Sequence, residues 1–330
     1  MTMGSAPKGN YAMTIPLPVS LSDQGPGLRD LVDMGYKEAW SSEANGADAF
    51  IPLALAAVHA PELRLGTAII PAYTRGPALL AQSVATMAAI APGRFACGIG
   101  SSSNVIVEHW NGIPFVDPYK KTRDVVRFLK EALTGEKVTV DYETLAVKGF
   151  RLGMEPPKEK VPVLIAALRE GMLRLAGREG DGAIINWLSA EDVRTVASIV
   201  HEQGAGKEIV ARIFVCPNPD TETVRREAKR AIAAYLNVPV YRAFHEWLGR
   251  TDRLGEHWKK WDEGDRAGSL EAMPDSIVDE LVIHGTPQQC RDHIDRYLKN
   301  GVTTAALMVM PFGGIDPMQA IRDLAPRESS

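Results

Sequence analysis

The chain has 330 residues, of which 45% are hydrophobic and 24% charged, a composition typical of a soluble globular protein and unlike disordered, collagenous or membrane proteins. Its 37 Lys and Arg residues against 41 Asp and Glu residues give a net charge of -4 without a basic stripe, so we expect no nucleic-acid partner. The longest nearly apolar run, residues 51–60, is shorter than the roughly 20 residues that cross a bilayer, so we expect no membrane partner either.

The first ten residues lack the apolar core of a signal peptide, which predicts a flexible tail over 1–10 ahead of a cytoplasmic domain over 11–330. The three cysteines, Cys97, Cys216 and Cys290, are widely spaced and belong to no Cys-x-x-Cys or Cys/His motif. This pattern argues against disulfides and structural zinc, so we expect buried thiols and no metal site.

Short β-rich apolar runs bounded by turn residues predict eight strands. Several of these runs are continuously apolar rather than alternating, as strands covered on both faces require. The predicted strands span residues 11–17, 37–42, 63–70, 94–99, 162–167, 183–187, 209–215 and 303–309.

Amphipathic helices are predicted between these strands. Apolar stripes with helical spacing run from Leu80 to Ala91 and from Val224 to Tyr235. The last helix has a strong start signal, because Thr286 and Gln289 form a capping box around Pro287 at the first helical position. Eight strands alternating with helices predict an α/β protein with a single (β/α)8 TIM barrel.

Two segments exceed the minimal barrel. Residues 138–152, after the fourth helix, alternate around a polar turn and predict a β-hairpin. Residues 236–281 separate the seventh helix from the eighth strand and carry five aromatic side chains. Two interpretations remain open for this second insertion: aromatic packing or a subunit contact, and a wall or lid over the substrate.

In such barrels the active site is built from residues just after the C-terminal ends of the strands. Residues 98–103 place glycines and hydroxyls where a ring or phosphate can approach the backbone, although a tight turn has the same composition. Residues 167–171 are typical of a helix start with free amides and one cation, Arg169, which suits a phosphate; the alternative is an ion pair with Glu170.

His109 is the candidate for proton transfer, and a hydrogen-bonded structural histidine is the alternative interpretation. The seven histidines are scattered, so no Ser/His/Asp triad can be assembled, and no metal-ligand spacing occurs. An organic cofactor is therefore the economical explanation, because it carries the reactive atom itself.

Several motifs spread along the chain together resemble the luciferase-like monooxygenase superfamily, most closely the coenzyme F420-dependent (deazaflavin) oxidoreductases of actinobacteria. The resemblance covers nearly the whole chain and agrees with the predicted barrel. The motifs are LGT at 65–67, RGP at 75–77, AQ at 81–82, PGRFACGIG at 92–100, WNGIPF at 110–115 and HGTP at 284–287.

This resemblance implies hydride transfer between coenzyme F420 and a small organic substrate, with binding and orientation supplied by the mouth of the barrel. The alternatives are an FMN-dependent monooxygenase that activates molecular oxygen, and a non-catalytic flavin-binding protein on the same fold. It further implies a homodimer, for which the alanine-rich apolar helices over 50–60 and 78–91 are suited.

The resemblance also implies a set of site residues. A non-prolyl cis peptide under the cofactor ring falls at Ala68-Ile69, and the turn over 168–172 holds the cofactor phosphate. The sequence departs from the pattern at Ala44, where several relatives have His, and at Leu168 and Arg169, where many have two glycines. The implied cofactor-binding residues are Glu43, Ala68, Ile69, Ile70, Ser101, Ser102, Ser103, Ala167, Leu168, Arg169, Gly171 and Met172, with Glu43 and His109 as the catalytic, proton-handling groups.

Overall fold

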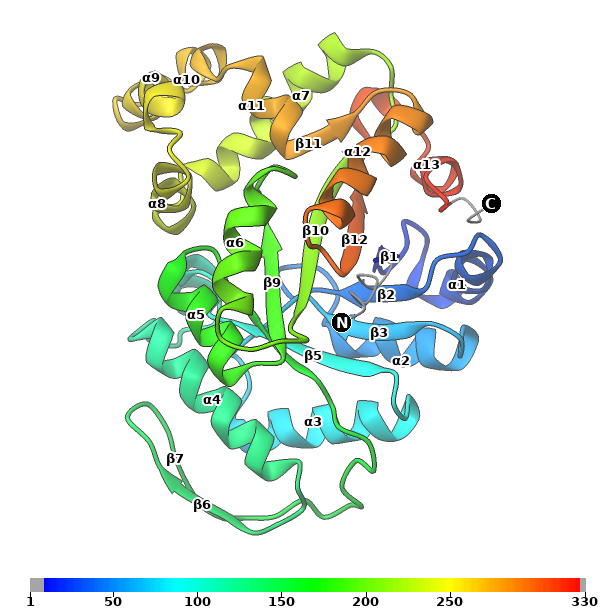
Figure 1. Cartoon of the computed structure of the whole chain (residues 1–330), viewed down its shortest axis with the longest axis vertical. Helices are drawn as coiled ribbons and strands as arrows, with labels where there is room; N and C mark the ends of the chain where they lie inside the picture. Colours follow the sequence, from blue (N-terminus) through cyan, green and yellow to red (C-terminus); the bar gives the residue numbers. More distant parts are fainter. Residues whose placement is uncertain (1–8, 327–330) are drawn as a thin grey trace, which may run out of the picture.

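Eight parallel strands close into a barrel in the computed structural model, which describes residues 9–326 (Figure 1). Neighbouring strands pair in chain order, and the last strand pairs with the first to complete the ring. The (β/α)8 fold and all eight predicted strands are thus confirmed. The barrel strands are β1 (Asn10–Ile15), β2 (Glu38–Ser41), β3 (Arg64–Thr67), β5 (Phe95–Gly100), β8 (Val163–Ala166), β9 (Gly182–Asn186), β10 (Glu208–Cys216) and β12 (Thr304–Val309).

Helices connect consecutive strands and cover the outside of the barrel (Figure 1). The capping box forms as predicted: Thr286 Oγ1 accepts from the Gln289 amide at 3.3 Å, and Gln289 Oε1 accepts from the Thr286 amide at 2.8 Å. The helices are α1 (Gln24–Asp33), α2 (Phe50–His59), α3 (Pro77–Ile90), α4 (Pro118–Ala132), α5 (Glu170–Glu179), α6 (Asp192–His201), α7 (Thr221–Leu236), α12 (Pro287–Lys299) and α13 (Pro317–Asp323), with short turns η1 (Leu21–Asp23), η2 (Val105–Trp110) and η3 (Phe312–Gly314).

Both insertions have the predicted positions, at opposite ends of the molecule in Figure 1. The first is the hairpin of β6 (Val138–Asp141) and β7 (Ala146–Phe150). The second contains α8 (Pro239–Trp247), α9 (Thr251–Asp262), α10 (Arg266–Ala272) and α11 (Asp275–Leu281). It ends in a strand that we did not predict, β11 (Val282–His284), which pairs with the last three residues of β10.

The interior of the barrel is apolar in its middle and closed at its amino end by a buried carboxylate. Glu38 accepts hydrogen bonds from Trp40 Nε1 at 2.9 Å, Asn10 Nδ2 at 2.9 Å and Thr304 Oγ1 at 3.1 Å, and pairs with Arg64 at 3.4 Å. These hydrogen bonds and the ion pair offset the free energy that burying the charge costs. The middle layer above it consists of Ala12, Trp40, Ala68, Ala96, Leu164, Ile184, Val210 and Ala306.

Other predictions concern single side chains. Cys97, Cys216 and Cys290 are free and buried, as expected. Tyr235, expected on the buried stripe of α7, is 41% exposed, which corrects that prediction. Its ring instead packs on Trp187 at the carboxyl end of β9, with ring centroids 4.6 Å apart.

Within residues 9–326, no helix is long and apolar enough to cross a membrane, and no three His, Cys, Asp or Glu side chains gather as metal ligands. Residues 1–8 of the predicted tail lie outside the described part of the chain, and Asn10 already belongs to β1.

Candidate active site

The end of β3 has the unusual backbone that the resemblance implied. The Ala68-Ile69 peptide is cis, and the chain then resumes as the short strand β4 (Ile70–Pro71), which pairs with the end of β5. The Ala68 amide donates to the Ser41 carbonyl at 2.6 Å, and the Glu43 amide donates to the Ile69 carbonyl at 3.1 Å. The Ile69 side chain packs against the interior apolar layer. The predicted strand-two acid and the predicted cis peptide are therefore neighbours.

The Glu43 carboxylate is engaged in an ion pair. Its partner is Arg75, which follows β4 and also reaches Asp48 at 3.4 Å. The Arg75 guanidinium lies 5.0 Å from the centre of the Phe50 ring, and the two paired side chains are only 17% and 15% exposed. Arg75 was absent from the predicted site residues, although it lies in the loop that follows the predicted strand over 63–70.

At the end of β5, the glycines serve the packing of the barrel. A Cβ atom on Gly98 would lie 1.9 Å from the Thr67 carbonyl oxygen, so only glycine allows β3 and β5 to approach this closely. Ser102 adopts a positive φ of 62°, uncommon for a residue other than glycine and a feature concentrated at functional sites. Ser103 Oγ accepts from the Ile106 amide at 3.3 Å, at the start of η2. Ser101 Oγ has one weak contact, to the Ser102 carbonyl at 3.4 Å.

His109 lies on η2, a single π-helical turn of the kind often found at functional sites. Its side chain is exposed and forms no hydrogen bond or ion pair with any residue between 9 and 326. The hydrogen-bonded structural histidine considered above is therefore not observed. No contact in the described chain joins His109 to Glu43, so the two proton-handling candidates stay separate predictions.

The turn after β8 has the free donors that a phosphate requires. Arg169 is the residue before α5, and no side chain caps the amides of that helix. Glu170 pairs with Arg174 at 2.9 Å, not with Arg169, which forms no ion pair within the described residues. Gly171 has open space where a side chain would stand. An uncapped helix start beside an unpaired arginine is a ready anion site.

The facing wall of the barrel mouth carries polar residues that the sequence interpretation missed. Val210 belongs to the interior layer, and strands alternate, so Arg212 also faces inward, level with Asn186 on β9. Arg212 Nη2 lies 3.1 Å from Met308 Sδ, and burial lowers the pKa of this guanidinium. Asn186 Nδ2 donates at 3.2 Å to the hydroxyl of Tyr241, which comes from α8 of the second insertion. The sequence did contain a signal for Arg212, because it is a charged residue at an inward-facing position of an otherwise apolar predicted strand.

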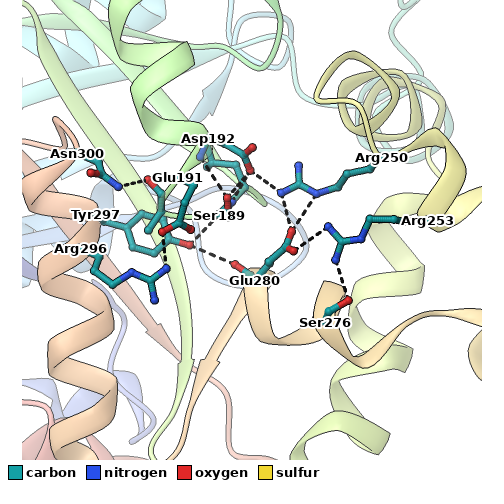
Figure 2. Close-up of polar contacts among 12 residues, drawn as sticks. Ser189, Glu191, Asp192, Arg250, Arg253, Ser276, Glu280, Arg296, Tyr297 and Asn300 are labelled. Carbon is teal, nitrogen blue, oxygen red and sulfur yellow. Dashed lines mark hydrogen bonds and ion pairs between the residues drawn. The ribbon is translucent and has the colours of Figure 1, made fainter.

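The second insertion is anchored to the barrel by the polar cluster in Figure 2. Arg250 Nη2 contacts Asp192 at 2.6 Å and Glu280 at 2.9 Å, and Arg253 contacts Glu280 at 2.8 Å. Asp192 also accepts from the Ser189 amide at 2.8 Å. These contacts join α9 and α11 to the start of α6, so ion pairs tie the insertion to the barrel.

Comparison with known proteins places these observations in a family. The model of a family described as luciferase-like monooxygenase matches residues 28–304. The 5,10-methylenetetrahydromethanopterin reductase of Methanolobus tindarius is 26% identical over 281 residues, covering 82% of this chain and 84% of that protein. The F420-dependent glucose-6-phosphate dehydrogenase of Rhodococcus hoagii is 29% identical over 327 residues, covering 91% and 94%. The solved coenzyme F420 dependent tetrahydromethanopterin reductase from Methanopyrus kandleri shares the fold, with a TM-score of 0.79 at 20% identity over 96% of this chain and 97% of that one.

Proposed function

Because the chain belongs to the luciferase-like monooxygenase family, we propose that it is an oxidoreductase that uses coenzyme F420 to transfer a hydride to or from a small organic substrate. The similarity to the F420-dependent glucose-6-phosphate dehydrogenase of Rhodococcus hoagii supports this branch over the oxygen-activating one. Bound F420 would supply the hydride-carrying carbon, C5 of the deazaflavin ring.

The observation that carries the proposal is the uncapped start of α5 with the unpaired Arg169, at the same end of the barrel as the Ala68-Ile69 bulge. Arg169 and the amides of residues 170–172 would hold the cofactor phosphate by charge-assisted hydrogen bonds. Ile69, with Glu43 beside it, would support the ring, and Ser101 to Ser103 would line the pocket. The hydrogen-bond donors at the start of α5 thus fit a phosphate, and the surface at Ile69 fits a flat ring.

The protein's own residues would then orient the reactants and exclude water. The bulge at Ala68-Ile69 and the apolar side chains of Phe214 and Met308 face one interior from opposite sides of the ring of strands. Glu43, paired with Arg75, would be the polar group beside the ring and would tune the electrostatic potential there or handle a proton. His109, exposed on η2, would exchange the proton with solvent.

A titration of the purified full-length protein with F420 and with FMN tests this function. We expect F420 to bind at least about tenfold more tightly, a difference of about 1.4 kcal/mol, and its visible absorbance to be lost when a substrate reduces it. Oxygen consumption with reduced FMN would instead support the monooxygenase. Binding of either cofactor without turnover across a substrate panel would support the non-catalytic flavin-binding protein.

We also propose a cytoplasmic homodimer formed through α2 and α3. Their outer faces expose apolar side chains: Ile51 is 61% and Val58 70% exposed on α2, and Leu79 is 54% and Ile90 41% exposed on α3. Several exposed apolar side chains on two adjacent helices are typical of a subunit interface. Light scattering at micromolar concentration should give twice the chain mass, and Val58→Lys should shift it toward the monomer. A monomer for the unmodified chain would contradict the proposal.

A further inference from the structure

Arg212 on β10 is a cation inside the barrel without a counterion. None of the described carboxylates pairs with it; its contacts are Met308 Sδ at 3.1 Å and the Phe214 ring, whose centre is 5.9 Å away. The side chain is half-buried. Removing the charge of Arg212 from water costs free energy. The contacts with the Met308 thioether and the Phe214 ring offset only part of that cost. An apolar residue at this position would pack among the same neighbours without that cost.

Two further buried polar atoms at the carboxyl ends of the barrel strands lack hydrogen-bond partners among the described residues. Thr14 Oγ1, on β1 of the same interior, and Trp187 Nε1, directly after β9, are both buried without a hydrogen bond. Trp187 is 2% exposed and stacks on Phe214, with ring centroids 3.9 Å apart and planes at 20°. Its φ of 53° lies in the left-handed region, which a bulky residue adopts only where its surroundings enforce it. Buried polar atoms without a protein partner are uncommon in native proteins, and an ordered water or a ligand group is the usual explanation for them.

The position of Arg212 separates it from the proposed cofactor site. Around the ring of strands, β3 with the Ala68-Ile69 bulge is third and β10 is seventh of eight, so Arg212 faces the bulge from the opposite wall. Arg169, which we assign to the cofactor phosphate, is exposed at the start of α5 on the outer side of the barrel mouth. The two arginines therefore serve different ligands or different ends of one active site.

We propose that Arg212 binds an acidic group of the substrate, an oxyanion of the carboxylate type, with Asn186 and Tyr241 beside it. This inference rests on the proposed function only in placing the substrate inside the barrel mouth. The planar guanidinium presents parallel N–H donors that match the two oxygens of a carboxylate. Phe214, Trp187 and Met308 form an apolar surround. The substrate class is thus a small organic acid with an apolar body next to its charged group.

Benzoate and benzamide, alike in shape but not in charge, test the site by calorimetric titration of the full-length protein without cofactor. We expect the wild type to bind benzoate at least about tenfold more tightly than benzamide, as a charge-assisted contact predicts. Arg212→Met should abolish this preference, and Arg212→Lys should retain part of it. Arg226→Ala, which removes an exposed arginine of α7 outside both sites, should leave it unchanged. A wild type without the preference, or a preference that survives Arg212→Met, overturns the proposal.

Two measurements separate this site from the cofactor and from misfolding. Arg212→Met should keep or raise Tm, because it removes an uncompensated charge, and it should leave F420 affinity unchanged. If it weakens F420 binding as much as Arg169→Ala does, the arginine serves the cofactor and the proposal is wrong. Because the benzoate titration contains no F420, failure of the protein to bind F420 would refute the proposed function and leave the acid site standing.

Discussion

Arg250 and Arg212 both place a guanidinium in the protein interior, and they have opposite surroundings. Arg250, whose side chain is 6% exposed, touches Asp192 and Glu280 in the cluster that anchors the second insertion (Figure 2). Burial lowers its pKa, and these two carboxylates outweigh the burial and raise it. For Arg212 burial dominates and lowers the pKa, and none of the carboxylates in residues 9–326 pairs with it. A cation that the fold itself neutralises holds the fold together, whereas one that the fold leaves unpaired is available to a ligand.

The largest expected effect is on stability, from Arg250→Met. The substitution leaves Asp192 and Glu280, 15% and 29% exposed, without their shared cation. Breaking a buried pair in this way should lower the free energy of unfolding by about 3 kcal/mol. Arg253→Met is the control, because Arg253 is exposed and pairs with the same Glu280, so its loss should cost less than about 1 kcal/mol. Urea denaturation measures the free energy of unfolding of both variants. Equal losses in the two variants would show that Arg250 contributes no more to stability than the exposed Arg253.

The second-largest expected effect is on F420 affinity and concerns Arg169, the exposed arginine at the mouth of the barrel. Arg169→Ala should weaken F420 binding by about 1.5 to 3 kcal/mol, the range of hydrogen bonds to charged groups, and should leave Tm unchanged because Arg169 has no partner within the described chain. Arg174→Ala is the matched control on the same helix, since Arg174 pairs with Glu170 and Glu202. Fluorescence titration measures the affinity. Unaltered affinity in Arg169→Ala would refute the phosphate assignment.

The third prediction is the pH dependence of stability that arises from His245 in the second insertion. His245 on α8 is fully buried, and burial, helped by Arg250, lowers its pKa to about 3. A histidine in the unfolded chain has a pKa near 6.5. Between pH 6.5 and pH 3 the unfolded state therefore binds a proton that the folded state does not bind, and the free energy of unfolding falls as the pH falls. The loss from this residue is about 2 kcal/mol at pH 5 relative to pH 8.

Replacing His245 by Leu should remove this part of the pH dependence, whatever its effect on stability at pH 8. The exposed His201→Asn variant should keep the wild-type dependence. Denaturant unfolding at pH 8 and pH 5 gives the comparison. Equal pH dependence in the wild type and His245→Leu would show that His245 is protonated in the folded protein.

The fold was predictable because its signals are local. Apolar runs, turn residues and the Thr286 capping box each depend on a few neighbouring residues, and all were found as expected. The strand β11 escaped because three residues directly after a helix carry no period. Arg212 escaped for a different reason: its importance lies in the carboxylates that are absent around it, and such an absence is a property of the described three-dimensional structure. Likewise, Arg169 and Glu170 are adjacent in sequence, and only the structure shows that Glu170 pairs with Arg174.

The smallest expected effect is on turnover, from Glu43→Gln. Glu43 lies beside the bulge, where its amide donates to the Ile69 carbonyl, and its carboxylate pairs with Arg75. The variant keeps the backbone contact and removes the charge, so cofactor affinity should change little while turnover falls by about tenfold, equivalent to about 1.4 kcal/mol in the barrier.

Asp48→Asn is the control for Glu43→Gln, because it weakens the other contact of the same arginine, at 3.4 Å, on a side chain that is 38% exposed. Steady-state kinetics on an identified substrate, with F420 titrations alongside, separate the two variants. If both lose turnover equally, the role of Glu43 is to hold Arg75 in place. If Glu43→Gln retains wild-type turnover, Glu43 belongs with Arg250 among the groups that the fold pairs for its own stability, and proton transfer must involve His109, solvent or the substrate.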